Sequence, residues 1–130
     1  MLFIYNLLVE ITIVLLRILS LISIKVKFFV DEHNKSLKKL IEFNIKADDK
    51  RLWFHCASLG EFEQSKPLIQ KIKSKYPKSK ILISFFSPSG YQIGKNYKFA
   101  DFVCYLPFDS KKNVNYFLNI IKPSIVFLIK

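Results

Sequence analysis

Four short apolar runs recur between Arg51 and the end of the chain, and a helical pattern separates each run from the next. We predict strands at residues 51–56, 80–86, 102–106 and 125–129. The predicted helices follow the first strand as far as Tyr76-Pro77, cover residues 91–97, and run from Asp109 or Ser110 to Ile121. Strands that are apolar on both faces and alternate with helices are typical of a parallel sheet covered on both sides. The chain is therefore predicted to be an α/β protein with a Rossmann-like parallel sheet.

The two longer helices carry apolar residues at helical spacing. Those expected to face the sheet are Leu68, Ile69 and Ile72 in the first helix and Val114, Phe117, Leu118 and Ile121 in the last. Such a stripe is what a helix needs in order to cover one face of a sheet.

Polar loops follow three of the four predicted strands at one edge of the sheet, at residues 58–61, 87–90 and 107–110. Ligands of open α/β sheets bind outside the carboxyl ends of the strands, so these loops are the candidate site. The first loop contains Ser58, Gly60 and Glu61, and Gly60 permits a sharp turn or a close approach to a ligand. The same pattern also fits a structural role, with Ser58 as a helix cap and Glu61 as an acid favoured by the helix dipole.

The first 24 residues are dominated by Leu, Ile, Val and Phe, with Glu10 and Arg17 as the charged residues. The segment is long enough to span a bilayer as a helix, and we expect a membrane-anchor helix at residues 1–24. On a helical wheel, one side carries the polar residues Asn6, Glu10, Arg17, Ser20 and Lys27. This stripe leaves open a helix that lies in the membrane interface, and a buried core helix is a third possibility.

The formal net charge of +11 comes almost entirely from lysine, since Arg17 and Arg51 are the only arginines. Nucleic-acid recognition favours the arginine fork and no nucleic-acid motif is present, so we expect no nucleic-acid partner. A basic surface next to an apolar helix instead fits an anionic membrane face. By the positive-inside rule, the rest of the chain is placed on the cytoplasmic side by Lys25, Lys27, Lys35, Lys38 and Lys39.

Residues 25–50 form the expected link between the anchor and the first strand. Leu37, Leu40, Ile41 and Ile45 recur at helical spacing, and Asp48-Asp49-Lys50 predicts a turn. The segment is therefore predicted to be an amphipathic connector.

The two cysteines, Cys56 and Cys104, both lie in predicted strands. A doubly wound order separates the first strand from the third by more than the Cα spacing of a disulfide, so both are expected to be free, buried thiols. His33 and His55 are isolated, and the sequence contains no metal-ligand spacing. No metal site is therefore expected.

Three motifs at the junctions between strands and helices resemble those of one known family. They are residues 53–64 (WFHCASLGEFEQ) followed by Pro67-Leu68-Ile69, then residues 85–91 (FFSPSGY), then residues 105–109 (YLPFD). In this order, and over residues 51–130, they resemble the Kdo (3-deoxy-D-manno-octulosonic acid) transferases of lipopolysaccharide synthesis. The apolar anchor before them is similar in kind.

The resemblance implies a GT-B glycosyltransferase of two Rossmann-like domains that moves Kdo from CMP-Kdo to a lipid A precursor (lipid IVA). It implies that Glu61 is the general base for the attacking sugar hydroxyl. The expected acceptor-binding residues are Ser58, Gly60, Ser87, Ser89 and Gly90. The resemblance implies no metal or cofactor, and it places the protein at the cytoplasmic face of the inner membrane.

Two features depart from the family pattern. Asp31-Glu32-His33-Asn34-Lys35 stands where the family carries a Gly-Arg-Lys-type basic turn. The chain also stops at Lys130, before the family's acidic and aromatic motif with its second functional carboxylate and before the CMP-binding domain. We therefore expect a truncated N-terminal half in which residues 51–130 form a partial Rossmann-like acceptor domain.

The sequence leaves three interpretations open. The first is the N-terminal part of a Kdo transferase, inactive alone or completed by a separate chain. The second is a non-catalytic, membrane-anchored α/β fragment that binds acceptor lipid or anionic membrane. The third is a degraded fragment that does not fold stably. We favour the first, because three motifs match in the correct order.

Overall fold

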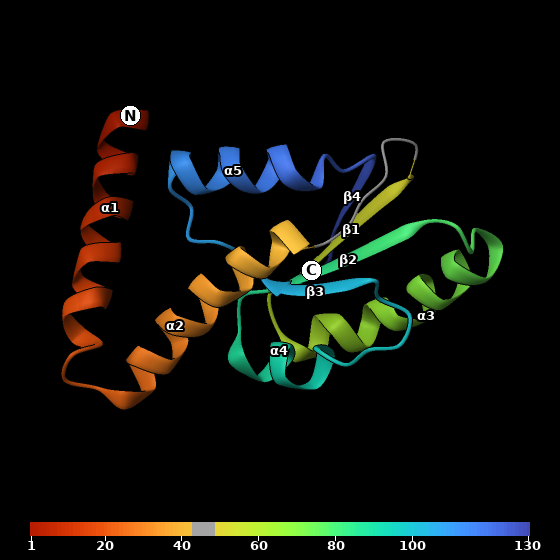
Figure 1. The fold of residues 1–130 in the computed structure, drawn as a ribbon, viewed down its shortest axis with the longest axis horizontal. Helices are drawn as coiled ribbons and strands as arrows, with labels where there is room; N and C mark the ends of the chain where they lie inside the picture. Colours follow the sequence, from red (N-terminus) through yellow and green to blue (C-terminus); the bar gives the residue numbers. More distant parts are fainter. Residues whose placement is uncertain (43–48) are drawn as a thin grey trace.

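The computed structural model describes residues 1–42 and 49–130. Two helices, α1 (Leu2–Leu19) and α2 (Ile24–Lys39), precede the one-turn helix η1 (Leu40–Glu42). The sheet and its helices follow in the order β1 (Arg51–Cys56), α3 (Leu59–Lys75), β2 (Lys80–Phe85), α4 (Pro88–Gly94), β3 (Phe102–Tyr105), α5 (Lys111–Ile121) and β4 (Ile125–Leu128) (Figure 1). Two positions of the predicted connector, Ile45 and Asp48, lie outside the described residues.

The four strands form one parallel sheet in the order β3-β2-β1-β4. Near its centre, Phe54 of β1 is paired with Ile83 of β2 on one side and with Phe127 of β4 on the other. The chain steps outward from β1 to β3 and then returns past β1 to place β4, which is the reversal of a doubly wound sheet. The parallel α/β architecture predicted from the sequence is confirmed.

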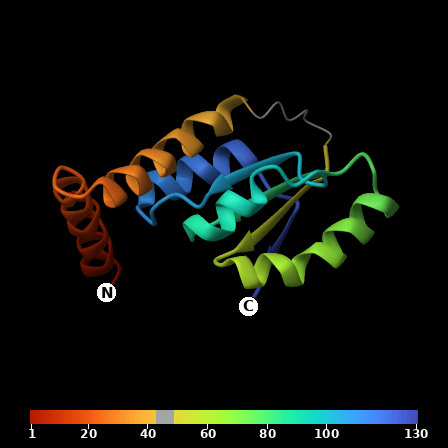
Figure 2. The same cartoon turned by 90° about the horizontal axis from the view of Figure 1, so that it is seen from below.

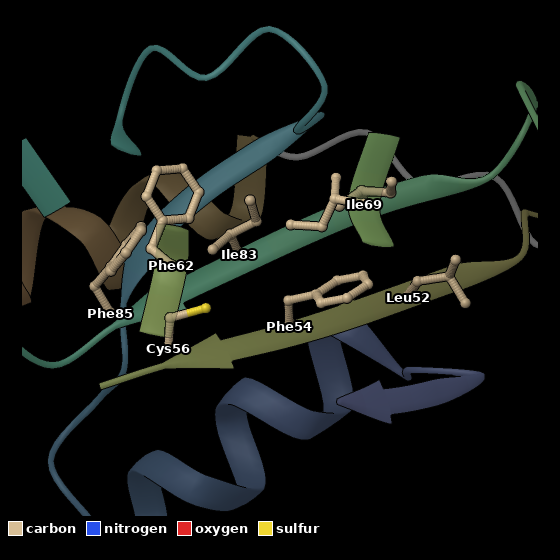
Figure 3. Packing of buried hydrophobic residues seen from close by; sticks show 8 residues of the cluster. Leu52, Phe54, Cys56, Phe62, Ile69, Ile83 and Phe85 are labelled. Carbon is tan, nitrogen blue, oxygen red and sulfur yellow. The ribbon is translucent and has the colours of Figure 1, made fainter. Parts of the chain in front are cut away.

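Two hydrophobic cores cover the two faces of the sheet, because successive side chains of a strand point to opposite sides. One core contains Leu52, Phe54, Cys56, Phe62, Ile69, Ile81, Ile83 and Phe85 (Figure 3). The other contains Leu40, Leu82, Cys104, Phe117 and Ile121. Helices α2 and α5 accordingly lie on one side of the sheet and α3 on the other (Figure 2).

Two residues that were predicted to face the sheet do not. Leu68 of α3 and Leu118 of α5 are each 40% exposed, whereas their neighbours Ile69 and Phe117 are buried. A helix turns by about 100° per residue, so the neighbour of a fully buried residue points to the side of the buried stripe. The buried stripe of each helix is therefore narrower than the stripe predicted from the sequence.

The start of α4 differs from the prediction, and the start of α5 decides between the two residues that were predicted for it. Helix α4 begins at Pro88 and not near Tyr91, because proline is well suited to a first helical position, where its missing N–H has no helical partner. Ser110, and not Asp109, is the N-cap of α5, and its Oγ accepts a hydrogen bond from the Asn113 N–H at 3.3 Å.

The apolar N-terminal segment is interrupted. Helix α1 ends at Leu19 and α2 starts at Ile24, so the helical part of the expected anchor is residues 2–19. The Ser20 Oγ donates a hydrogen bond to the Arg17 carbonyl oxygen at 2.6 Å, an interaction by which serine competes with helical backbone bonding. By length and composition α1 can cross a membrane, although a signal sequence or a core helix passes the same test.

Asp101 connects α3 to the sheet. Its carboxylate pairs with Lys73 at 2.7 Å and Lys80 at 3.5 Å, and it accepts a hydrogen bond from the Ile81 N–H at 2.8 Å. Burial raises the pKa of the Asp101 carboxyl, but the two lysines and the amide outweigh burial and hold this pKa below its usual value.

Candidate functional site

The three polar loops predicted from the sequence lie side by side at the carboxyl edge of the sheet. The Ser87 N–H donates a hydrogen bond to the Ala57 carbonyl oxygen at 2.9 Å, which joins the loops after β1 and β2. The Leu106 N–H donates to the Phe85 carbonyl oxygen at 2.7 Å, which joins the loop after β3 to the end of β2. The sheet topology therefore gathers these loops at one edge, where open α/β sheets bind ligands.

Ser58 and Glu61 form a reciprocal capping box at the start of α3. The Ser58 Oγ accepts a hydrogen bond from the Glu61 N–H at 3.4 Å, and the Glu61 Oε2 accepts one from the Ser58 N–H at 3.1 Å. The helix begins at Leu59, so Glu61 occupies its third position. The capping role that the sequence left open for Ser58 and Glu61 is therefore present. Its hydrogen bonds hold the Glu61 carboxylate at the carboxyl edge of the sheet.

The predicted sharp turn at Gly60 is absent. Gly60 lies in the first turn of α3 without a positive φ, and an added Cβ would find only the Ser58 Oγ, at 4.0 Å. The local backbone conformation would therefore accept other residues. The space around this position is open, which leaves close approach of a ligand as a prediction.

Ser87 and Ser89 lie together at the start of α4. The Ser87 Oγ accepts a hydrogen bond from the Gly90 N–H at 3.1 Å and lies 3.2 Å from the Ser89 Oγ. A Cβ added at Gly90 would meet the Phe85 ring at 2.6 Å, and one added at Gly94 would meet the same ring at 2.5 Å. Both glycines are thus required for packing α4 on Phe85, whatever else Gly90 does.

His55, at the end of β1, belongs to this edge although the sequence interpretation treated it as isolated. The Trp53 Nε1–H donates a hydrogen bond to the Ser84 Oγ at 2.8 Å, and the same oxygen lies 3.0 Å from the His55 Nδ1. Burial lowers the pKa of His55, while Ser84 and the Glu61 carboxylate act in the opposite direction. The sequence feature that could have indicated this contact is Ser84, the single serine inside the second apolar run.

A second cluster that the sequence did not reveal holds α2 over the end of β3. The His33 ring is buried and stacks on Tyr105 at 4.2 Å and on Phe108 at 4.9 Å between ring centroids. Its Nδ1–H donates to the Phe29 carbonyl oxygen at 2.9 Å. The Ser36 Oγ accepts a hydrogen bond from the Tyr105 N–H at 2.7 Å. His33 and Ser36 thus pack α2 against the candidate edge.

The two thiols are buried and free, as predicted. Cys56 is on β1 and Cys104 on β3, and β2 separates these strands in the sheet. Burial raises the pKa of both thiols; at Cys56 it outweighs the opposing hydrogen bond with Ser65. Neither cysteine is therefore a candidate nucleophile.

These features define the class of protein: a doubly wound α/β unit with capped polar loops gathered at the carboxyl ends of parallel strands. The sequence profile of the 3-deoxy-D-manno-octulosonic-acid transferase (kdotransferase) family matches residues 29–130, and the chain belongs to this family. The matched region is the N-terminal glycosyltransferase domain of the family.

Two relatives are much longer than this chain. The chain is 36% identical over 130 residues to a bifunctional glycosyltransferase/methyltransferase of Fusobacterium nucleatum, covering 97% of this chain and 19% of the relative. It is 31% identical over 80 residues to a 3-deoxy-D-manno-octulosonic acid transferase of Aquifex aeolicus, covering 61% of this chain and 22% of the relative. The chain thus spans about a fifth of the length of these relatives. No solved structure matches it.

Proposed function

We propose that this chain is the acceptor-binding part of a GT-B glycosyltransferase that moves Kdo from CMP-Kdo to a lipid A precursor such as lipid IVA. Family membership supports a glycosyltransferase, and the relative from Aquifex aeolicus carries the name of the Kdo-transferring enzyme. The observation that carries the proposal is the position of Glu61, a carboxylate held by a capping box at the carboxyl edge of the sheet.

In this proposal Glu61 is the general base. A sugar hydroxyl is a poor nucleophile, and a carboxylate within hydrogen-bond reach can take its proton as the hydroxyl attacks the donor sugar. The hydrogen bond from the Ser58 N–H to the Glu61 Oε2 restricts the side chain to one position. Such restriction favours catalysis, because a base that is already fixed loses less conformational entropy when the substrate binds.

The acceptor is proposed to contact the loops on either side of Glu61. Ser58 and Ser87 belong to adjacent loops, and Ser89 lies beside Ser87. Their hydroxyl groups can donate to and accept from a sugar. Gly60 leaves space for the acceptor, and Gly90 allows α4 to present both serines.

The donor site is proposed to lie in the remainder of the longer protein, since the matched region is the N-terminal domain. The proposed enzyme uses no metal or cofactor. Its proposed location is the cytoplasmic face of the inner membrane, with α1 as the attachment. The exposed apolar residues of α1 and the positive charge of the chain support attachment to an anionic membrane.

The test is Kdo transfer by a complete transferase that carries these residues. Purified protein, CMP-Kdo and lipid IVA are expected to give Kdo-modified lipid without added metal. Removal of residues 1–24 is expected to release the protein from membranes. Transfer of a different sugar would contradict the proposed donor, and absence of transfer would favour the alternative of a non-catalytic module that binds acceptor lipid or anionic membrane.

A further inference from the structure

Helix α1, all of whose residues the structure describes, has two different sides. None of its residues is buried, but one stripe is less exposed than the rest and consists of Asn6, Val9, Ile13 and Leu16. The opposite arc is apolar and exposed, and contains Phe3, Ile4, Leu7, Leu8, Ile11, Val14, Leu15, Ile18 and Leu19. At about 100° per residue, the charged residues Glu10 and Arg17 fall outside this arc, next to the stripe.

The less exposed stripe lies lengthwise against the rest of the protein. Near the N-terminal end of α1, the Tyr5 hydroxyl donates a hydrogen bond to the Asp109 carboxylate. There Leu2, Tyr5 and Asn6 share a cavity with Asp109, Lys111, Val114 and Asn115. Nearer the other end, Ile13, Leu16 and Arg17 share a cavity with residues of α2, the β3–α5 loop and α5, namely Val30, His33, Asn34, Pro107, Phe108 and Asn113. Both halves of α1 therefore contact the body that contains the sheet.

This docking is difficult to combine with a helix that crosses a bilayer. Tyr5 lies 14 residues before Leu19 in α1, which is about 21 Å along the helix axis. Across a hydrocarbon core of about 30 Å, Tyr5 would lie deep in the far half of the membrane. Asp109, Lys111 and the loop before α5 would have to follow it there. Charged side chains and lipid-exposed loop backbone are strongly disfavoured at that depth.

The same contacts are compatible with a helix that lies flat. The apolar arc then enters the acyl region, while the docked stripe and the α/β body remain on the water side. Lysines flank both ends of the helix: Lys25 and Lys27 follow its C-terminal turn, and Lys111 and Lys112 begin α5 beside Tyr5. The exposed side chains of Leu21, Ile22 and Ile24 extend the apolar surface beyond the helix.

We infer that α1 lies in the plane of an anionic phospholipid surface, with its apolar arc in the lipid, and does not cross the bilayer. The lipid bilayer is the occupant of the arc because the arc is wide and uncharged and is bordered by lysines at both ends. The inference rests on the membrane attachment in the proposed function but not on its chemistry. It also determines how the protein is oriented on the membrane, because α1 holds the α/β body beside the headgroups along its full length.

The first test is a cross-link between α1 and the β3–α5 loop on vesicles of phosphatidylethanolamine and phosphatidylglycerol. The variant Tyr5→Cys/Asp109→Cys is treated with a short bis-maleimide and digested, and the joined peptides are measured by mass spectrometry. The matched control is Tyr5→Cys/Lys75→Cys, because Lys75 lies at the far end of α3. The two native thiols are buried. Variants with only one introduced cysteine give the background yield of cross-linked peptides.

Vesicle-bound protein is expected to give the Tyr5–Asp109 cross-link at a yield well above that of the control pair. A cross-link that forms in detergent but is absent on vesicles would overturn the inference, because α1 would then have left the body on entering the membrane. Failure of the protein to bind vesicles would overturn the membrane attachment in the proposed function and the inference together. Transfer activity is not measured, so these results are independent of the role of Glu61.

The second test keeps Asp109 intact. In the single variant Tyr5→Cys, the cysteine replaces a side chain that is 50% exposed and next to the docked stripe. A membrane-impermeant maleimide added to the side that holds the body is expected to label it on intact vesicles. Labelling only after the vesicles are dissolved would show a crossing helix and would overturn the inference.

Discussion

Substitutions of Glu61 separate its role as a helix cap from its proposed role as a base. Glutamine also functions at the third helical position of a capping box, so Glu61→Gln is expected to keep the hydrogen bond to the Ser58 N–H. It loses the favourable charge in the first turn, which lowers the free energy of unfolding by about 0.3–1 kcal/mol. The rate of Kdo transfer is expected to fall roughly 10²–10⁴-fold, the usual contribution of a positioned base.

Glu61→Ala removes the base and the cap together. The Ser58 N–H loses its side-chain acceptor, which costs about a further 0.5–1.5 kcal/mol of stability. The transfer rate is expected to match that of Glu61→Gln, because both variants lack the carboxylate. The assay measures kcat with CMP-Kdo and lipid IVA in a complete transferase, together with the denaturant midpoint of each variant.

Glu63→Gln is the matched control on the same helix. Glu63 has a side chain that is 52% exposed and pairs with Lys66 at 2.6 Å on the surface. Such pairs contribute about 0–1 kcal/mol, so neither the rate nor the midpoint is expected to change much. The reasoning is refuted if Glu61→Gln transfers Kdo as fast as Glu63→Gln, because Glu61 would then be a cap and nothing more.

Three further predictions follow from packing and charge. Gly90→Ala should lower the free energy of unfolding by about 1–3 kcal/mol by overpacking against the Phe85 ring, measured by denaturant melts. Asp101→Asn should flatten the acid side of the stability curve: with its folded pKa below 3.8, Asp101 stabilises the protein above that pH, and this stability is lost as pH falls through the lowered pKa. Both native thiols should resist a maleimide until the protein unfolds, since they are buried.

Each of these predictions has a clear contrary outcome. An unchanged melting midpoint for Gly90→Ala would show that the Phe85 ring can move aside at little cost. A parallel loss of stability in acid for Asp101→Asn and the unsubstituted protein would assign the acid sensitivity to other carboxyl groups. Rapid labelling of either thiol under native conditions would place that strand in an open part of the molecule.

The sequence predicted the sheet well because its strands are apolar on both faces. The runs at residues 51–56, 80–86, 102–106 and 125–129 each match an observed strand to within one residue at either end. Helix faces were predicted less well, since apolar residues such as Leu68 and Leu118 occur on partly exposed helix surface as well as in the core. Composition alone does not distinguish the two positions.

The candidate site was predicted in part. The loops with Ser58 and Ser87 follow strands directly, so parallel topology was sufficient to bring them to one edge. The cluster around His33 depends on α2 folding back over β3, a contact between segments about 70 residues apart that no local pattern specifies. The link from His55 to Ser84 likewise depends on the register of β1 and β2.

The contact of α4 with Phe85 has a consequence for how the sequence can vary. One aromatic ring fills the space in which side chains at positions 90 and 94 would stand. Evolution therefore cannot treat these three positions independently: a larger residue at either glycine requires a smaller residue in place of Phe85. Homologues that lack the aromatic residue are the ones in which alanine or serine is expected at positions 90 and 94. A library that varies this region would sample functional sequences efficiently only if the three codons were randomised together.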